Sequence, residues 1–335
     1  MAKAFEIEGF DVNDGIRECL LKLFRAKTDE MYFYYDQLFD NRDIEILHSA
    51  RVSSRRLLAL FKVFRPVFPQ KKFLKIYSPL YNFKNILGPV RENDVLLKMI
   101  GDYISGYAQQ DVKALMLFFA KLKNDNISAR ARLFRNKELV NFAGHREKLD
   151  AFFEKHLLNL KKDTNLIDIG LSFKENAILV LPHLYENVKK HQDKVHNHPR
   201  NKVLLHKMRI KAKPLRYTME FYLKAFGDEF RNCYEEIKSF VEKTGDIHDA
   251  DVITEHVMNY LKELRIFNDT QKGRKEKIST KSLREYLGIL KSTRKERFNE
   301  VSAILNKWED DDFGIRLENT MQSVQICENN ICPKP

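Results

Sequence analysis

Residues that interrupt helices are scarce in this chain. Its 335 residues include 12 glycines and 9 prolines, about half of their average usage. Period-two alternation of apolar and polar residues, which is typical of half-buried strands, is also rare. Apolar residues instead recur at three- and four-residue spacing nearly throughout, as they do along one face of an amphipathic helix. We therefore predict an all-α fold built from long helices.

Cysteines and long apolar runs are few as well. The cysteines at positions 19, 233, 327 and 332 form no CxxC pair, so we expect reduced thiols rather than a disulfide framework or a zinc site. The first residues are mixed in charge and lack the apolar stretch of a signal peptide. No window approaches the roughly 18 uninterrupted apolar residues of a membrane span. These features predict a cytoplasmic protein that does not enter a membrane.

Acidic residues are in deficit over most of the chain. Lys and Arg number 59 against 47 Asp and Glu, a net charge of +12. Residues 309–335 hold six acids and two bases, which leaves an excess of +16 on residues 1–308. Such an excess is typical of proteins that meet a polyanion, an acidic partner or an anionic membrane surface. We interpret 309–335 as an irregular or peripheral tail whose acidic run folds against basic surface and competes there with an anionic ligand.

Two parts of the chain resemble each other. HSARVSSRRL begins at His48 and HKMRIKAKPL at His206, and each has bases three and seven residues after the histidine and a leucine nine residues after it. GPVRENDV from Gly88 and GDIHDADV from Gly245 follow these histidines by 40 and 39 residues. Two motifs in the same order at nearly the same separation indicate an internal duplication.

The duplication predicts a division of the chain. The polar stretch KKDTN at 161–165 is a suitable boundary between two helical halves. We expect an N-terminal extension, a first helical-bundle repeat, a second helical-bundle repeat and an acidic C-terminal tail, at residues 1–12, 13–165, 166–308 and 309–335.

The repeated bases lie on one side of each predicted helix, at 100° per residue, and apolar residues lie on the other. The two basic ridges consist of His48, Arg51, Arg55 and Lys62, and of His206, Arg209, Lys213 and Arg216. Most charged stripes are only a solvated face. Like charges at this spacing, however, repel by a few tenths of a kcal/mol per pair, and a bound polyanion would offset that repulsion. Because guanidinium groups bind phosphate bidentately, the twice-repeated ridge favours a phosphate-rich ligand.

The glycine motifs extend this hypothesis. Gly88 and Gly245 are predicted to begin helices, whose free N–H groups favour an anion. Arg91 and His248 then occupy equivalent first-turn positions. The acids of these motifs are predicted to cap the helices or to hold neighbouring arginines, with simple complementation of the helix dipole as the alternative; they are Asp94, Asp249 and Asp251.

Two residues near the end of the second ridge call for separate predictions. Pro214 stands in the middle of the predicted helix, where a missing N–H and a steric clash should kink it. Glu220 lies one turn beyond Arg216, which favours an intrahelical ion pair between the two.

The four matching runs resemble the CHAD family, the conserved histidine α-helical domain. They are LHSARVSSRRL (47–57), ILGPVRENDV (86–95), LHKMRIKAKPLRY (205–217) and TGDIHDADV (244–252). The resemblance implies two pseudo-symmetric antiparallel four-helix bundles with a basic cavity or pore between them. It also implies non-catalytic binding of inorganic polyphosphate and association with polyphosphate granules. The triphosphate-tunnel (CYTH) enzyme domain of many relatives is not expected here.

Carried over position by position, the resemblance names candidate polyphosphate-binding residues. They are His48, Arg51, Arg55, Arg56, Lys62, Arg91, His206, Arg209, Lys213, Arg216 and His248. Three positions depart from the family pattern, namely Leu58 where arginine is frequent, Glu92 for the usual aspartate, and Pro214 where a second base is expected. These departures predict a lopsided site, to which neither a cofactor nor a metal ion is assigned.

Three functions remain open from the sequence. Polyphosphate binding should weaken with salt and tighten below the histidine pKa, whose reference value is about 6.5; phosphate or sulfate should mimic the ligand. A metal-dependent phosphohydrolase could use His206, His248, Asp249 and Asp251, although the neighbouring arginines would repel a cation. A nucleic-acid or acidic-protein binder is the third hypothesis, and RNA recognition would usually add aromatic stacking platforms.

Overall fold

The computed structural model describes residues 7–329, apart from 41–42, 107–111, 162, 199–200, 272 and 274–276. The described chain is helical, which confirms the predicted all-α class. In chain order the helices are α1 (Ile16–Asp40), α2 (Ile44–Val63), α3 (Gln70–Ile86), α4 (Gly88–Gly106), α5 (Lys113–Phe134), α6 (Lys137–Asn141), α7 (Arg146–Leu157), α8 (Ala177–Lys189), α9 (Gln192–Asn197), α10 (Lys202–Tyr222), α11 (Asp228–Thr270), α12 (Lys281–Asp310) and α13 (Phe313–Asn329), with 3₁₀ turns at Arg65–Val67 and Phe142–His145.

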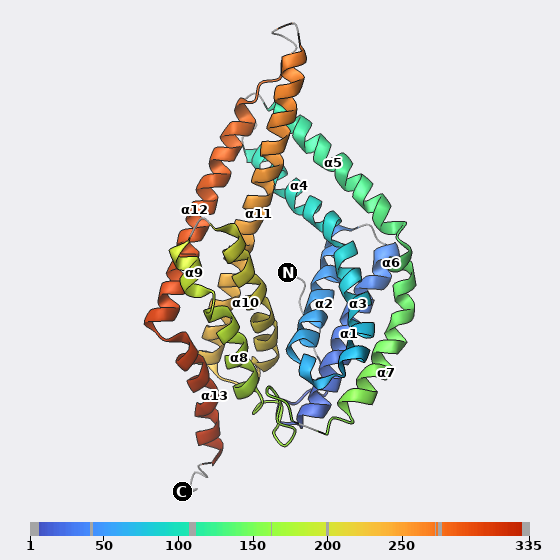
Figure 1. Ribbon diagram of the computed structural model, residues 1–335, viewed down its shortest axis with the longest axis vertical. Coiled ribbons are helices and arrows are strands. Elements are labelled where there is room, and N and C mark those ends of the chain that lie inside the picture. Colours follow the sequence, from blue (N-terminus) through green and yellow to red (C-terminus); the bar gives the residue numbers. More distant parts are fainter. Residues whose placement is uncertain are drawn as a thin grey trace.

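The helices form two halves that face each other across the molecule (Figure 1). One half contains α1, α2, α3, α6 and α7, and the other contains α8 to α13. Helices α2 and α10 line the inner sides of the two halves and also contact each other. The hairpins α4–α5 and α11–α12 meet at one end, where a separate apolar cluster joins them. The internal duplication itself stays a prediction.

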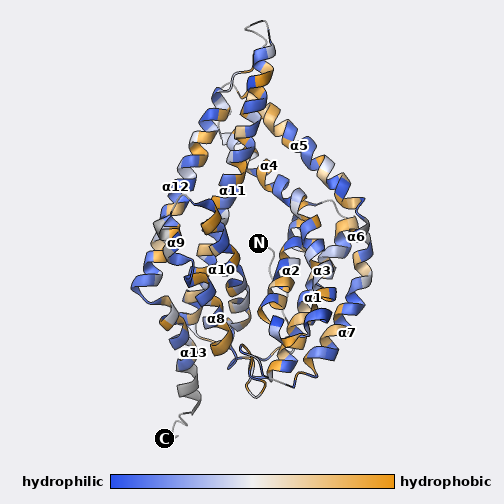
Figure 2. Cartoon of the chain, viewed as in Figure 1, coloured by the Kyte–Doolittle hydropathy of each residue, from blue (hydrophilic) through white to orange (hydrophobic). Residues whose placement is uncertain are grey.

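Aromatic side chains fill the core of each half. Phe24 of α1 contacts Phe61 of α2 edge to face, at 5.0 Å between ring centroids. In the other half, Trp308 of α12 lies 5.1 Å from both Phe240 and Phe313. Apolar and polar residues alternate around the helices at helical spacing (Figure 2), so each helix buries one side and exposes the other.

Gly245 does not begin a helix as predicted. Helix α11 runs without a break from Asp228 to Thr270 and includes this glycine. The prediction holds for Gly88, which is the first residue of α4. The physical difference is the next residue: Pro89 lacks the N–H that would continue the preceding helix, whereas Asp246 supplies one.

The interpretation of residues from 309 onward as an irregular tail is wrong for the described part. Helix α12 continues to Asp310, and α13 packs against α8, α11 and α12. Phe313, Leu317 and Met321 of α13 are buried in the main core. The Nη1 and Nη2 atoms of Arg316 each donate a hydrogen bond to the carboxylate of Glu236 on α11. The acidic segment therefore belongs to the second half of the fold.

Among the described helices, none is both long and apolar enough for a membrane span. Cys19 and Cys233 are buried free thiols. Cys332 and the side chain of Cys327 lie outside the described residues.

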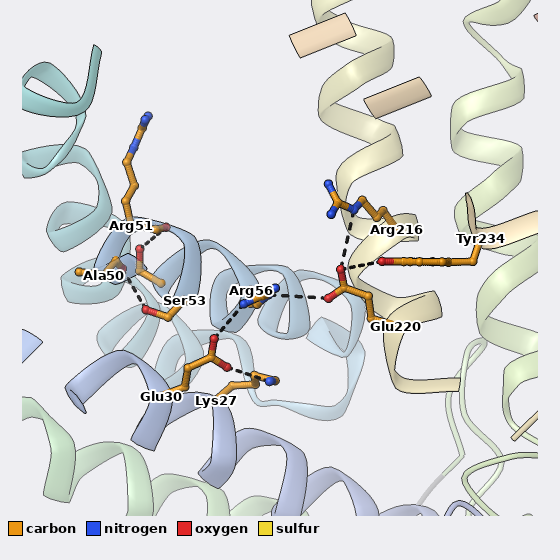
Figure 3. A network of polar contacts seen from close by, with 10 residues as sticks. Lys27, Glu30, Ala50, Arg51, Ser53, Arg56, Arg216, Glu220 and Tyr234 are labelled. Carbon is orange, nitrogen blue, oxygen red and sulfur yellow. Dashed lines mark hydrogen bonds and ion pairs between the residues drawn. The ribbon is translucent and has the colours of Figure 1, made fainter. Parts of the chain in front are cut away.

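A chain of buried charges links the two halves (Figure 3). Glu30 of α1 is fully buried and accepts hydrogen bonds from Lys27, at 2.8 Å, and from Arg56 of α2, at 2.9 Å. Arg56 also pairs with Glu220 of α10, at 3.7 Å from Nε to Oε2. Glu220 in turn pairs with Arg216, at 3.7 Å, as predicted for these neighbours on one helix. The network thus connects α1, α2 and α10.

Replacing Glu30 by glutamine should destabilise the protein. Lys27 would then be buried without a counter-ion, and breaking a buried pair in this way costs roughly 3–5 kcal/mol. We expect a lower midpoint of urea unfolding with an unchanged slope. The control is Glu154→Gln, which removes an exposed ion pair with Arg25 and should cost no more than about 1 kcal/mol. Equal midpoints for the two variants would show that the network does not stabilise the fold.

Candidate functional site

A cavity of about 540 Å³ lies between the two halves. Helices α2, α3 and α4 form one side of it, and α10 and α11 form the other. The N-terminus of α2 is capped by Asp43, which accepts from the Glu45 N–H, and that of α10 by Asn201. Seven Lys or Arg residues, three His and two acids are among the described residues that line the cavity.

Most of the predicted binding residues meet in this cavity. The first half contributes the side chains of the α2 ridge and the base of the first glycine motif, and the second half contributes its equivalents. The predicted residues that line the cavity are His48, Arg51, Arg55, Lys62, Arg91, His206, Arg209, Lys213 and His248, together with the supporting Asp249. The two ridges, 158 residues apart in the sequence, therefore face one space.

Arg56 and Arg216 do not line the cavity, contrary to the prediction. Both are buried, at 5% and 6% exposure, and both pair with Glu220 in the network that links the halves. Arg51 extends away from this network (Figure 3). Because Arg56 is one residue from Arg55, it lies about 100° around α2 from the cavity-facing ridge. Its position in the family motif does not make it a ligand contact.

Asp94 and Asp251 hold arginines, but not those of the cavity. Asp94 accepts hydrogen bonds at 3.1 Å from Arg130 of α5. Asp251 accepts one at 2.8 Å from Arg294 of α12 and also pairs with Lys202. Equivalent acids of the two motifs thus join each motif helix to the helix that follows it. Of the two predicted roles, capping and holding arginines, Asp94 and Asp251 show the second, and through it they tie neighbouring helices together.

Lys84 and three tyrosines also line the cavity and were not predicted. Tyr77 and Tyr81 of α3 lie 6.1 Å apart in a stacked arrangement, and Lys84 lies over the Tyr81 ring at 4.3 Å. Tyr217 of α10 is the third tyrosine. The spacing of four and three residues on α3 places this set on one helical face, and that pattern could have identified it. Pro214 lines the cavity as well, and α10 continues through it to Tyr222.

Several buried nitrogen atoms in the cavity have no hydrogen-bond partner within the described structure. The Nε atoms of Arg51 and Arg209 and the Nδ1 atom of His206 are buried and make no hydrogen bond there. A buried donor without a partner is unfavourable by about 1–3 kcal/mol. An anion in the cavity would supply the missing acceptors, so the geometry is that of an anion-binding site.

Burial and the neighbouring cations lower the pKa values of basic side chains in the cavity. Burial, together with the nearby Arg55, lowers the pKa of Lys213 to about 5. The pKa of Arg51 falls to about 10 for the same reasons. Burial and Arg91 lower the pKa of His48 to about 4, and burial and Arg209 do the same for His248. The histidines therefore titrate well below the expected 6.5 while the cavity holds no anion.

The arrangement does not suit the metal-site hypothesis. The rings of His206 and His248 lie 4.9 Å apart between centroids, but Asp251 is engaged by Arg294 and Lys202. Within the described part of the chain, no three or more His, Cys, Asp or Glu side chains are grouped to hold a metal ion. Arginines stand where a cation would have to bind.

The absence of a side chain at Gly245 leaves room for the guanidinium group of Arg209. A Cβ atom on this glycine would lie 3.0 Å from a terminal guanidinium nitrogen of Arg209, so the missing side chain admits the arginine. Gly245→Ala should displace the guanidinium and weaken phosphate binding by severalfold. Because alanine favours a helix interior by up to about 1 kcal/mol, the melting temperature should stay the same or rise.

The matched control is Gly288→Ala in α12, where a Cβ would meet open space. This variant should stabilise the helix similarly and leave phosphate affinity unchanged in calorimetric titration. Equal affinities for both variants and the wild type would show that Gly245 does not position Arg209 for binding.

Comparisons with known proteins agree with this architecture. The family model of the CHAD domain matches residues 23–258. The crystal structure of the CHAD domain from the plant Ricinus communis is similar with a TM-score of 0.64 at 18% identity, covering 90% of this chain and 95% of that one. PptA from Streptomyces chartreusis is similar with a TM-score of 0.51 at 11% identity, covering 92% of this chain and 100% of that one. No match to a curated protein is found. At these identities the two structures support the fold alone, but the family model spans more than half of the sequence, and this chain therefore belongs to the CHAD domain family.

Proposed function

We propose that this protein binds inorganic polyphosphate in the cavity between its two halves and does not chemically change it. The observation that carries the proposal is the convergence of seven Lys or Arg side chains on one cavity, where buried guanidinium donors of Arg51 and Arg209 lack acceptors. The CHAD family resemblance supports the same ligand. Association with polyphosphate granules is part of this proposal.

A chain of phosphates suits this cavity better than a single phosphate. The Lys and Arg side chains of the cavity come from four helices, α2, α3, α4 and α10, and include the exposed Lys62. One phosphate group could neutralise only a few of these charges. A linear polyanion carries about one charge per phosphate unit and would release counterions along its length.

The aromatic residues of the cavity favour polyphosphate over nucleic acid. Tyr77 and Tyr81 stack on each other, and Lys84 lies over the Tyr81 ring. Tyr217 is buried. These contacts already occupy ring surface on which nucleobases would have to stack. RNA of matched charge should therefore compete poorly with polyphosphate.

Arg51→Ala and Arg209→Ala should each weaken polyphosphate binding by roughly tenfold to a hundredfold, because each removes charge-assisted hydrogen bonds of about 1.5–3 kcal/mol. Each should also lower the slope of log affinity against log salt by about one. Titration calorimetry at two or more ionic strengths measures both effects. The control is Arg231→Ala on the outer surface of α11, where an exposed arginine is removed. A polyphosphate affinity that does not change with salt concentration would contradict the proposed mechanism. An equal loss of affinity in Arg231→Ala and in the two cavity variants would contradict it as well.

Binding should take up protons at pH 7. With a pKa of about 5, Lys213 is neutral in the empty cavity, and the same holds for His48 and His248 with pKa values of about 4. Bound phosphates stabilise the charged forms and raise these pKa values. Affinity should therefore rise as the pH falls from 7, and the gain should end below about pH 4 to 5, where the free protein is already protonated.

Calorimetry with long-chain polyphosphate in buffers of different ionisation enthalpy measures the number of protons taken up. We expect a positive number that falls in a Lys213→Arg variant, since arginine stays protonated. Zero uptake by the wild type at pH 7 would contradict this prediction.

A further inference from the structure

Lys213 lies among cationic side chains in the cavity. Arg209 lies one turn earlier on the same helix, and Arg51 and Arg55 of α2 line the same cavity and disfavour a charge on the amine. Asp249 of α11 is the acid that influences it, and burial raises the pKa of that carboxyl group. Within the described structure, Lys213 makes no ion pair. The side chain therefore lacks the counter-ion that would hold a proton on it.

A lysine in such a place has the properties of a nucleophile. Burial and the neighbouring arginines lower its pKa to about 5, so the lone pair of Nζ is available at neutral pH. Lysines beside other cationic groups are activated in this way for reaction with carbonyl compounds. Arginines of the cavity would bind an anionic group of the reacting molecule. Because a single phosphate neutralises only a few of these charges, burial and the remaining arginines would still lower the pKa of Lys213.

We propose that Lys213 is a covalent attachment site for small carbonyl compounds that carry a phosphate group, which the arginines of the cavity orient while the amine forms an imine. The proposal rests on the anion-binding cavity of the proposed function, but it does not require that polyphosphate be the natural ligand. It assigns this cavity a reactive residue in addition to its binding residues.

The reaction balances without a further reagent. The Nζ lone pair of Lys213 attacks the carbonyl carbon, a C–N bond forms, and the carbonyl π electrons move to oxygen. A proton passes from nitrogen to that oxygen to give a carbinolamine. The hydroxyl group then leaves with a second proton as water, and the imine forms. Asp249, which lines the same cavity and whose pKa is raised by burial, is suited to supply the proton to the leaving hydroxyl.

Pyridoxal 5′-phosphate is a suitable probe, because it combines an aldehyde with a phosphate and absorbs light as an imine. The wild-type protein is treated with a small excess of the probe at pH 7 and reduced with borohydride, and the modified peptides are identified by mass spectrometry. We expect Lys213 to be labelled at least about tenfold faster than the exposed Lys207 on the same helix, because an ordinary lysine with a pKa near 10.4 is almost wholly protonated at this pH. Tripolyphosphate should protect Lys213, and pyridoxal without its phosphate should label it much more slowly.

Two variants sharpen the result. Lys213→Arg should abolish the fast adduct, and Lys207→Arg should leave it unchanged, with circular dichroism to check that both variants are folded. Labelling spread evenly over exposed lysines, or equal rates with pyridoxal and its phosphate, would overturn the proposal. A separate titration of the wild type with polyphosphate distinguishes the two proposals: selective labelling without polyphosphate binding would overturn only the proposed function, and tight binding without selective labelling would overturn only this inference.

Discussion

The cavity depends on the ion pairs that Arg56 and Arg216 both form with the carboxylate of Glu220. Helices α2 and α10 direct cationic side chains at each other, and without compensation their like charges would drive the halves apart. Arg56 of α2 and Arg216 of α10 both pair with Glu220, and Glu30 anchors Arg56 to α1. Because these groups are buried, solvent and salt screen them much less than surface pairs. Arg56 thus attracts α10 through Glu220, while the adjacent Arg55 faces the cations of the cavity.

The adjacent residues Arg55 and Arg56 have different roles in the structure. Arg55 lines the cavity, while Arg56 lies in the buried network, and the 100° turn between successive helical residues sends the two to different sides of α2. The network satisfies its own charges, so it does not compete for the ligand. The cavity keeps donors without acceptors, which are unfavourable in the empty protein and available to an anion. The motif thus places Arg56 in the buried network and Arg55 in the cavity where we propose that the ligand binds.

The sequence predicted the parts of the site that follow from spacing along one helix. The basic ridges at His48 and His206 were found because helical periodicity places their bases on one side. Lys84 was missed because it lies outside the repeated motifs from which the basic ridges were identified. Arg56 was misplaced because its partners, Glu30 and Glu220, lie on other helices, which no local pattern identifies. Arg216 was misplaced although its pair with Glu220 was predicted, because the spacing along α10 does not show that this pair is buried beside Arg56.

A polyphosphate that bound in the cavity would change the charge of the cavity itself. Burial lowers the pKa of Lys213 and raises that of Asp249, so it favours the neutral form of both side chains. The chain of phosphates would draw a proton onto Lys213, because it would stabilise the ammonium ion. It would also favour the protonated form of Asp249, because it would repel the carboxylate. Both changes would make the cavity more positive and increase its attraction for the phosphates. The pKa shifts would thus limit charge repulsion in the free protein and still allow the cavity to take up a highly charged ligand.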